Sequence, residues 1–318
     1  MTMYAIQAQR FGLARESVRG TAEAAPLKWY PTRGPIELNY ALQHLEDTGI
    51  RGIKSPYAPL AGMKVGEGKI PLHADPQMLG EFFYSLLGTK AAAQQGGTAA
   101  YLHTFTQQTG LQPPSYTFFI DRGLGVLKYN LGCVKEISLK GGVDNLLEIE
   151  AGVLFKTEAS GSIGSPSFPT AQYLGFQHVD FKIAGSSNTD VKEWDLKIDN
   201  GARAHRVLHL SQDLNDVIHP DLLSIEGGFT IYFQNTTERD KFIANTSVAI
   251  RILCEGATIA STYEYSLDIN VYAAKYKAFP YGEDQGLLAA KVTFQGFYST
   301  SDTKAIQVEI INTDTSYA

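Results

Sequence analysis

The residues best suited to catalysis by type and spacing are two glutamates, Glu148 and Glu150, in a stretch that predicts a β-strand. Side chains two positions apart in a strand share a face and lie about 7 Å apart. Such a separation occurs between the two carboxylates of glycosidases. Charges on the solvent face of an amphipathic strand explain the same pattern more simply. We therefore keep a β-rich hydrolase built on Glu148 and Glu150 as one alternative, and predict no catalytic residue.

Neither the histidines nor the glycine-rich stretches predict a cofactor site. His205 and His209 stand four residues apart in a predicted strand, where that spacing is too long for two ligands of one metal. The stretch Gly62-Met-Lys-Val-Gly-Glu-Gly-Lys69 resembles a phosphate-binding loop, but its spacing is one residue too long and Ile70 replaces the required Ser or Thr. We predict no metal, no nucleotide and no other cofactor.

Composition and charge narrow the function classes further. The 318 residues are 44% hydrophobic and 19% charged, which is enough to fold one large or two average domains. A formal net charge of −6 argues against gripping nucleic acid through its phosphates, which needs clustered Lys and Arg. The same charge is compatible with a channel through which DNA slides without binding.

Membrane and redox signals point to a protein made in the cytosol. The sequence has no apolar run long enough for a spanning helix. Residues 1–20 lack the apolar core of a signal peptide. We therefore expect Cys133 and Cys254 to be two reduced, buried thiols and not a disulfide.

The elements that would position any site are mostly strands, and residues 116–157 anchor them. Residues 134–140 alternate apolar and polar side chains with period two, as in a strand with one buried face. Gly141-Gly142 and Asp144-Asn145 predict a turn, and residues 147–155 predict a returning strand in which Gly152 marks a bulge. Adjacent strands joined by short turns predict an antiparallel meander.

Before this meander we expect an extended arm over residues 1–30, strands at 27–30 and 36–42, and a contact loop at 48–68. Asp75 and Pro76 predict the start of a helix over 77–87, whose apolar face Gly88 closes. Residues 91–100 predict a loop and residues 101–106 a strand.

Residues 161–172 contain the clearest linker, rich in Gly, Ser and Pro. After it, Asn200-Gly201 predicts a hairpin between a strand at 194–199 and a returning strand at 203–210. A short helix is expected around 239–243. Further strands are expected at 179–183, 228–233, 248–254, 263–274, 287–298 and 306–311.

The two halves of the chain share an order of elements. Glu67-Gly68 and Glu226-Gly227 both precede a short helix, and at the same offset Leu72 falls on Ile231 and Phe83 on Phe242. A tandem repeat of one β domain usually serves geometry, because two similar units per chain allow three chains to build a six-fold-like ring.

The chain resembles the tail tube (major tail) proteins of tailed bacteriophages over most of its length. The resemblance is carried by Gly12-Leu-Ala-Arg-Glu-Ser-Val-Arg-Gly-Thr21 and Leu79-Gly-Glu-Phe-Phe-Tyr-Ser-Leu-Leu-Gly88, and by the stretches 103–106, 114–117 and 131–139. It implies a mainly β protein of tandem tail-tube-type β-sandwich or β-barrel domains, each with a short α-helix. The family offers no active-site residues to transfer.

We therefore predict an arm at 1–30, a first domain at 31–160, a linker at 161–172 and a second domain at 173–318. The resemblance implies a structural virion protein, made in the host bacterial cytoplasm, that assembles into stacked rings around a channel for DNA ejection. Strands within 116–155 and 263–298 would line or support the channel, and deletion of residues 1–25 is expected to leave a folded protein that assembles poorly.

The implied partners are further copies of the chain and the other tail proteins: tape measure, tail terminator and baseplate or tip. Trimeric rings of two-domain subunits are favoured over hexameric rings, DNA passes without specific binding, and no membrane span is expected. A carbohydrate- or host-binding β-sandwich of a phage tail or capsid remains the alternative function.

Overall fold

The computed structural model describes residues 8–123, 125–162, 166–208 and 210–317, which form a mainly β protein with two short α-helices. The N-terminal half contains β1 (Arg10–Arg15), β2 (Lys28–Tyr30), β3 (Glu37–Leu45), β4 (Leu60–His73), α1 (Gly80–Leu87), β5 (Gly88–Gln94), β6 (Tyr101–Gln107), β7 (Tyr116–Asp121), β8 (Val126–Gly142), β9 (Glu148–Phe155) and β10 (Thr157–Gly161).

The C-terminal half contains a 3-10 turn at Phe176–His178, then β11 (Val179–Ile183), β12 (Ser186–Ser187), β13 (Val191–Asp199), β14 (Arg203–His205), β15 (Asp216–Ile218), β16 (Ser224–Tyr232), α2 (Thr237–Ile243), β17 (Val248–Ala260), β18 (Tyr263–Ala278), β19 (Tyr281–Asp284), β20 (Leu287–Phe297) and β21 (Ile306–Asn312). Among the described residues, no helix is long and apolar enough to cross a membrane.

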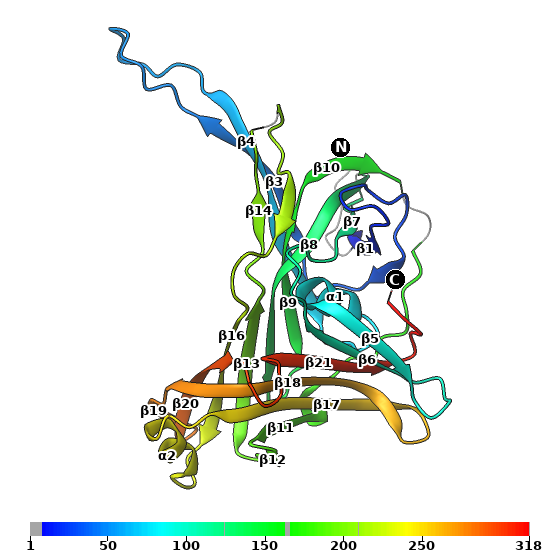
Figure 1. Cartoon of the computed structure of the whole chain (residues 1–318), viewed down its shortest axis with the longest axis vertical. Helices are drawn as coiled ribbons and strands as arrows, with labels where there is room; N and C mark the ends of the chain where they lie inside the picture. The colour runs from blue at the N-terminus through cyan, green and yellow to red at the C-terminus, as the bar shows by residue number, and fades with distance from the viewer. Residues whose placement is uncertain (1–7, 124, 163–165, 209, 318) are drawn as a thin grey trace.

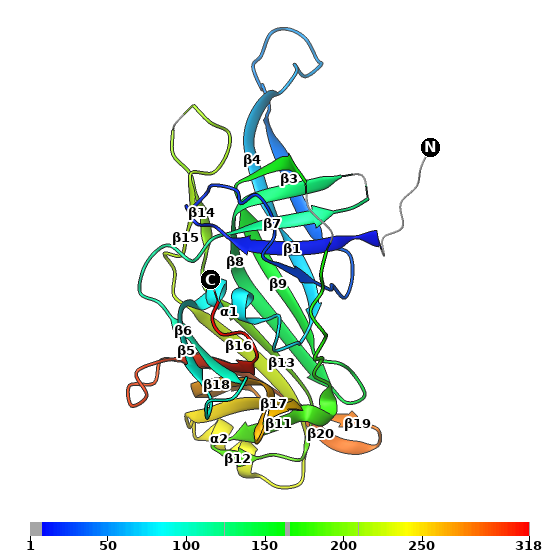
Figure 2. The same cartoon turned by 90° about the vertical axis from the view of Figure 1, so that its right-hand side faces the viewer.

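A central antiparallel sheet runs through both halves. Its strands pair in the order β3-β4-β9-β8-β13-β16-β20-β18, and β19 continues the edge of β18 along β20. The long strands β4, β9, β8, β13 and β16 lie side by side in Figures 1 and 2. The pairing of β8 with β13 joins the halves, so backbone hydrogen bonds cross between them.

A second layer of strands crosses one face of this sheet. In the N-terminal half it consists of β1, β7, β10 and the first part of β8, and in the C-terminal half of β11, β17, β21 and the first part of β18, extended by β6 and β5. One continuous cluster of buried side chains fills the space between the layers. The mainly β prediction is therefore confirmed.

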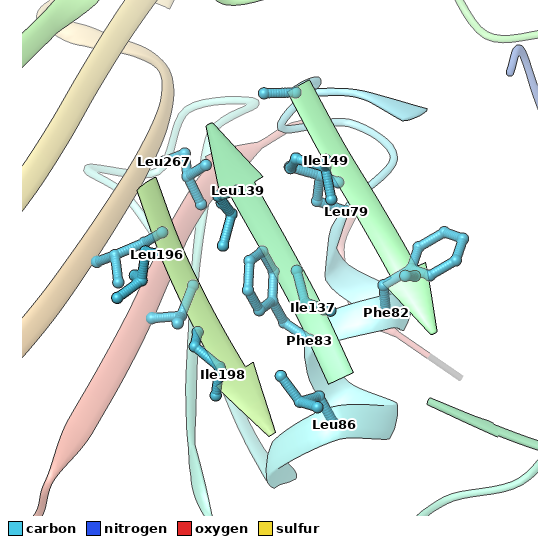
Figure 3. Close-up of a cluster of buried hydrophobic side chains, with 14 of the residues drawn as sticks. Leu79, Phe82, Phe83, Leu86, Ile137, Leu139, Ile149, Leu196, Ile198 and Leu267 are labelled. Carbon is cyan, nitrogen blue, oxygen red and sulfur yellow. The ribbon is translucent and has the colours of Figure 1, made fainter. Parts of the chain in front are cut away.

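Helix α1 lies inside this core. Figure 3 shows Leu79, Phe82, Phe83 and Leu86 against side chains of β8, β9 and β13. Gly88 ends the helix in the left-handed conformation, with φ of 85°, as the sequence predicts. The helix begins later than predicted, because residues 75–79 form a turn in which the Asp75 carboxylate accepts a hydrogen bond from the Gln77 N–H at 2.9 Å.

Five further local predictions differ from the structure. Residues 60–68, expected in a loop, belong to β4, because Gly66 and Gly68 allow neighbouring backbones to approach: a Cβ at Gly68 would lie 1.9 Å from the Glu37 carbonyl oxygen. Residues 91–94, also expected in a loop, continue β5. The predicted bulge lies at Lys135 of β8, opposite Gly152 and not at it.

The turn at Asn200-Gly201 makes no hairpin, since β13 pairs with β8 and β16 while β14 pairs with β15. Residues 10–15, expected in an extended arm, form β1 instead, which pairs with β2 and β7 and buries Phe11 and Leu13 completely or nearly so. Deletion of residues 1–25 would therefore remove part of the core.

The two halves repeat one pattern of antiparallel pairing. In the N-terminal half the pairs are β1–β2, β1–β7, β3–β4, β4–β9, β8–β9, β7–β8 and β8–β10. In the C-terminal half the matching pairs are β11–β12, β11–β17, β13–β16, β16–β20, β18–β20, β17–β18 and β18–β21. Helices α1 and α2 follow the matching strands β4 and β16.

Candidate functional site

The central sheet has one apolar face and one polar face, and the polar face is the candidate site. On β13, Trp194 and Leu196 are buried in the core, whereas Asp195 and Lys197 on the opposite face are exposed. Residues directly opposite each other on neighbouring strands share a face. The register therefore carries this polar face across the sheet from β3 to β20.

Acidic residues outnumber lysines on the polar face. The acids are Glu37, Glu67, Glu136, Glu148, Glu150, Glu193, Asp195, Asp199 and Glu226, and the lysines are Lys69, Lys135, Lys140, Lys192, Lys197 and Lys291. The excess of negative charge is spread over both halves and not gathered at one point. Such a surface creates a broad negative potential.

Ion pairs tie parts of the sheet together on or beside this face. Lys69 Nζ lies 2.7 Å from a Glu150 carboxylate oxygen, and Lys197 Nζ lies 2.7 Å from Glu136. These hydrogen bonds raise the pKa of both lysines. Arg33 lies 3.1 Å from Glu148. The pairs are largely exposed, so each contributes about 0–1 kcal/mol to stability.

Other acids on the face form no ion pair within the described residues, among them Glu37, Glu67 and Asp195. Although the Asp195 side chain reaches solvent, desolvation by the groups around it raises its pKa. A depression of about 570 Å³ opens beside it, where β8, β13, β16 and β20 meet, with Lys140 and Lys291 also lining it. Lys140 lies opposite both Glu148 and Asp195 in the register, so the depression is a mixed, open part of the same face.

The structure brings the predicted pair Glu148 and Glu150 together on one face of β9, but each is engaged in a separate ion pair. The stretch 62–69 lies within β4 and cannot wrap a phosphate as a loop would. His205 lies on β14, and His209 falls outside the described residues. Over the described ranges, no three His, Cys, Asp or Glu side chains gather as metal ligands would.

Both cysteines are free and buried, as the sequence predicts. Burial raises the pKa of the Cys133 thiol to about 12 and raises that of Cys254 as well. Two neutral, enclosed thiols of this kind are chemically inert.

The sheet that carries the polar face is open at both ends. Within the described residues, β3 pairs only with β4, and the segment 278–284 at the end of β18 and in β19 pairs only with β20. Figures 1 and 2 show the two edges far apart. Unpaired strand edges are ready to pair with another chain. Sequence patterns predicted a strand at 36–42 but neither the segment 278–284 nor the order of the strands, so the open edges were missed.

Two loops project from the same end of the molecule in both views (Figures 1 and 2). One is the tip of the β3–β4 hairpin at 46–59, where Ile50 is completely exposed, and the other is the β14–β15 loop, where Leu208 and Leu210 are completely exposed. The β14–β15 loop lies against β4, since the Lys64 N–H donates a hydrogen bond to the Gln212 carbonyl at 2.9 Å. Part of the predicted contact loop is therefore an apolar projection.

A protein-family model described as "Phage tail tube protein" matches residues 7–296, which is most of the 318-residue chain. No curated protein matches the chain.

Proposed function

The chain belongs to the phage tail tube protein family, and from this premise we propose that it assembles into stacked rings forming the hollow tube through which DNA is ejected. The family is structural and not enzymatic, so the protein is a structural component of the phage tail.

The acidic polar face of the central sheet carries the proposal. Double-stranded DNA bears one negative charge per about 1.7 Å of its axis. A wall with an excess of carboxylates repels these phosphates, so DNA slides past without being held. The lysines on the face are interspersed with acids, as Lys140 is between Glu148 and Asp195, and do not form a basic groove. We assign this face to the lumen of the tube.

The two open edges of the sheet support ring formation. An exposed strand edge in a monomer is an aggregation hazard unless a partner satisfies it. Here the edges are β3 at one end and 278–284 at the other, so joining one edge to the other in successive copies gives a head-to-tail contact. Head-to-tail contacts close into a ring when the rotation between copies allows it.

The repeated pairing pattern favours three chains per ring over six. We propose that the chain is a duplicated tube unit, with a boundary in the linker 161–172 and domains at 31–160 and 173–318, the first completed by β1 and β2. If each half takes one of six equivalent places, three chains complete a ring. The continuity of the sheet through β8 and β13 supports this, because the halves already join as neighbouring subunits would.

The apolar projecting loops support stacking of the rings. Their tips, at 46–59 and around Leu208 and Leu210, lie at one end of the molecule and would enter the adjacent ring (Figure 1). Burial of exposed leucine and isoleucine side chains would stabilise the stack by about 25 cal/mol per Å². The tape measure, tail terminator and baseplate or tip proteins would be the further partners inside and at the ends of the tube.

Light scattering after size exclusion, combined with negative-stain electron microscopy of the same fractions, tests the proposal. We expect rings or hollow tubes, and particle masses that rise in steps of three chains. Steps of six chains would contradict the trimeric ring but keep the tube. A protein that stays monomeric at high concentration and after seeding with tubes would refute assembly.

A further inference from the structure

On the premise that copies join in rings, we propose a specific junction between them: the outer edge of β3 pairs antiparallel with residues 278–284 of a second copy, with Leu38 opposite Tyr281. The junction would repeat, between chains, the pairing of β13 with β8 inside each chain. The register follows from the correspondence of the two halves, strand by strand.

The correspondence begins at two glycines. Gly68 of β4 lies opposite Leu38 on one side and Val153 on the other. Gly227 of β16 lies opposite Leu196 and Phe294 in the same way. Leu38 therefore corresponds to Leu196, and Val153 to Phe294. Both glycines are required by close neighbours, since a Cβ at Gly227 would lie 2.7 Å from the Asp195 carbonyl oxygen.

A register shift at the same place in β8 and in β18 supports this alignment of the two halves. In β8 the register shifts between Val134 and Glu136, which lie opposite Val153 and Gly152. In β18 it shifts between Tyr276 and Ala278, which lie opposite Phe294 and Thr293. Both halves therefore carry a one-residue bulge at the same place, and Ala278 corresponds to Glu136. Bulges re-aim a strand, so two matched bulges give the two strands the same course.

The alignment continues beyond the bulge to the residue that lacks a partner. Leu139 of β8 lies opposite Ile149, and Tyr281 of β19 lies opposite Ala290, so Tyr281 corresponds to Leu139. Inside the chain, Leu139 also lies opposite Leu196 of β13. Since Leu38 corresponds to Leu196, the strand missing beside Tyr281 is β3 of another copy, with Leu38 facing Tyr281.

Backbone groups at the two edges are oriented to make this pairing. The Pro280 carbonyl accepts a hydrogen bond from Lys291 N–H on β20, so the proline nitrogen, which has no hydrogen to donate, faces β20 too. Successive residues of a strand point their backbone N–H and C=O groups to opposite edges. Those of Phe279 and Tyr281, on either side of Pro280, therefore face the open edge. On the other edge, the Ile36 N–H donates to the Gln9 side chain at 3.3 Å and not to β4, so the N–H of Leu38 faces the same outer edge.

The side chains beside the open edge are apolar and incompletely covered. Tyr281 is 50% exposed, whereas its counterpart Leu139 is buried next to Leu196. Tyr281 packs on Phe233 and Phe279 with ring centroids 5.3 and 5.7 Å apart, which leaves a rigid aromatic cluster at the edge of the sheet. An arriving β3 would cover this cluster as β13 covers Leu139.

Cysteine pairs on the polar face test the register. The proposed junction places Glu37 opposite Gly282, since their counterparts Asp195 and Lys140 face each other. Both positions are exposed, and a side chain at Gly282 meets no atom within 4 Å, so E37C/G282C should fold. Directly opposite residues have Cα atoms about 4.5–5.5 Å apart, within the range of a disulfide. The control N39C/G282C is displaced by two residues to about 7–8 Å, which is too far.

Tubes of each variant are oxidised and run on a non-reducing gel. We expect covalent dimers and trimers for E37C/G282C, at least ten times more than for N39C/G282C or the single variants. Tubes that form normally but link equally in both double variants, or only in N39C/G282C, would overturn the register and leave the tube intact. A wild type that forms no rings would overturn the proposed function, and this junction with it.

Discussion

Helices α1 and α2 occupy matching places in the two halves but differ in burial. All eight residues of α1 are buried, whereas none of the seven residues of α2 is. Each helix packs an aromatic ring on its own half: Phe83 lies near Ile137 of β8 (Figure 3), and Phe242 stacks on Phe279 at 6.2 Å between centroids. Ile137 and Phe279 correspond in the alignment of the halves.

The difference lies in what covers each helix. Strand β13 continues the sheet beneath α1, and Asn200 after it donates hydrogen bonds to the Leu86 and Val134 carbonyls at 2.9 and 3.1 Å. The sheet ends beside α2 with the open edge 278–284. In the proposed ring, the pairing of β8 with β13 is the junction already made within the chain, and the open edge at 278–284 is the junction that a neighbouring copy would complete.

The largest effect is expected from removing β1, whose counterpart in the C-terminal half is β11. Deletion of residues 1–25 removes Phe11 and Leu13 from the core, where Phe11 packs on Tyr30 and Phe118 at 5.9 and 6.0 Å between centroids. Each lost side chain costs about 2–5 kcal/mol, a large part of a total stability of about 5–15 kcal/mol. Thermal melting followed by circular dichroism should show a protein that is unfolded or melts far earlier.

Deletion of residues 1–7, which keeps β1, is the matched control. A 1–25 deletion that melts like the wild type but fails to form tubes would restore the expectation of a dispensable arm and contradict the place of β1 in the core.

The next largest effect is expected from replacing the aromatic residues of the two helices, Phe83 of α1 and Phe242 of α2. F83A removes a fully buried ring and should destabilise the monomer by about 3–5 kcal/mol. F242A removes a half-buried ring and should cost the monomer about 1 kcal/mol, while lowering the yield of tubes. Urea unfolding of the monomer and electron microscopy of assembly measure the two effects. Equal destabilisation by both substitutions would remove the distinction between the junction within the chain and the junction at the open edge.

A smaller effect is expected at Asn200 and at Leu42, the residue of β3 that corresponds to Asn200 in the alignment of the two halves. N200A leaves two buried carbonyls without the Asn200 donor and should cost about 1–3 kcal/mol in urea unfolding of the monomer. L42A changes a side chain that is 42% exposed and should cost less than about 0.5 kcal/mol in the same assay. A monomer destabilised more by L42A than by N200A would contradict the comparison.

The smallest effect is expected from pH, through Glu81 of α1. Burial raises the pKa of Glu81 above its usual 4.5, although Tyr116 donates a hydrogen bond to it at 2.7 Å. The folded state thus holds this proton more tightly than the unfolded chain, so stability falls as pH rises from about 4.5 through the raised pKa. E81Q should reduce this fall.

D240N is the control for E81Q, because Asp240 corresponds in position but lies in solvent. Urea unfolding from pH 4 to 8 measures both variants. An E81Q protein with the same pH dependence as the wild type would show that Glu81 does not couple folding to protonation. Glu16, Asp75 and Asp195, whose pKa values desolvation also raises, remain in every variant and contribute to the residual slope.

Period-two patterns predicted strands such as β9 and β13, because alternation of buried and exposed residues is a local property. The aromatic-rich stretch 116–121 predicted β7 by its composition, and that strand is buried almost throughout. Glycines misled the prediction of residues 60–68, since Gly66 and Gly68 serve close strand approach and not a loop. The hairpin signal at Asn200-Gly201 failed because β13 finds its partners far along the chain, in β8 and β16. Only the folded chain shows such partners.

The candidate site was predictable in part. Alternating acids at Glu193, Asp195 and Asp199 are visible in the sequence, as are Glu148 and Glu150. That these two groups share one face depends on the register of β13 with β8 and of β8 with β9, which no local pattern sets. The open edges depend in turn on the whole strand order.

Hydrogen exchange of the backbone amides, in monomer and in assembled tubes, tests the equivalence of the two junctions most directly. We predict that the outward amides of β3 and of 278–284, Leu38 and Tyr281 among them, exchange fast in the monomer and become as protected in tubes as those of β8 and β13. Tubes in which both edges still exchange as fast as in the monomer would contradict the account.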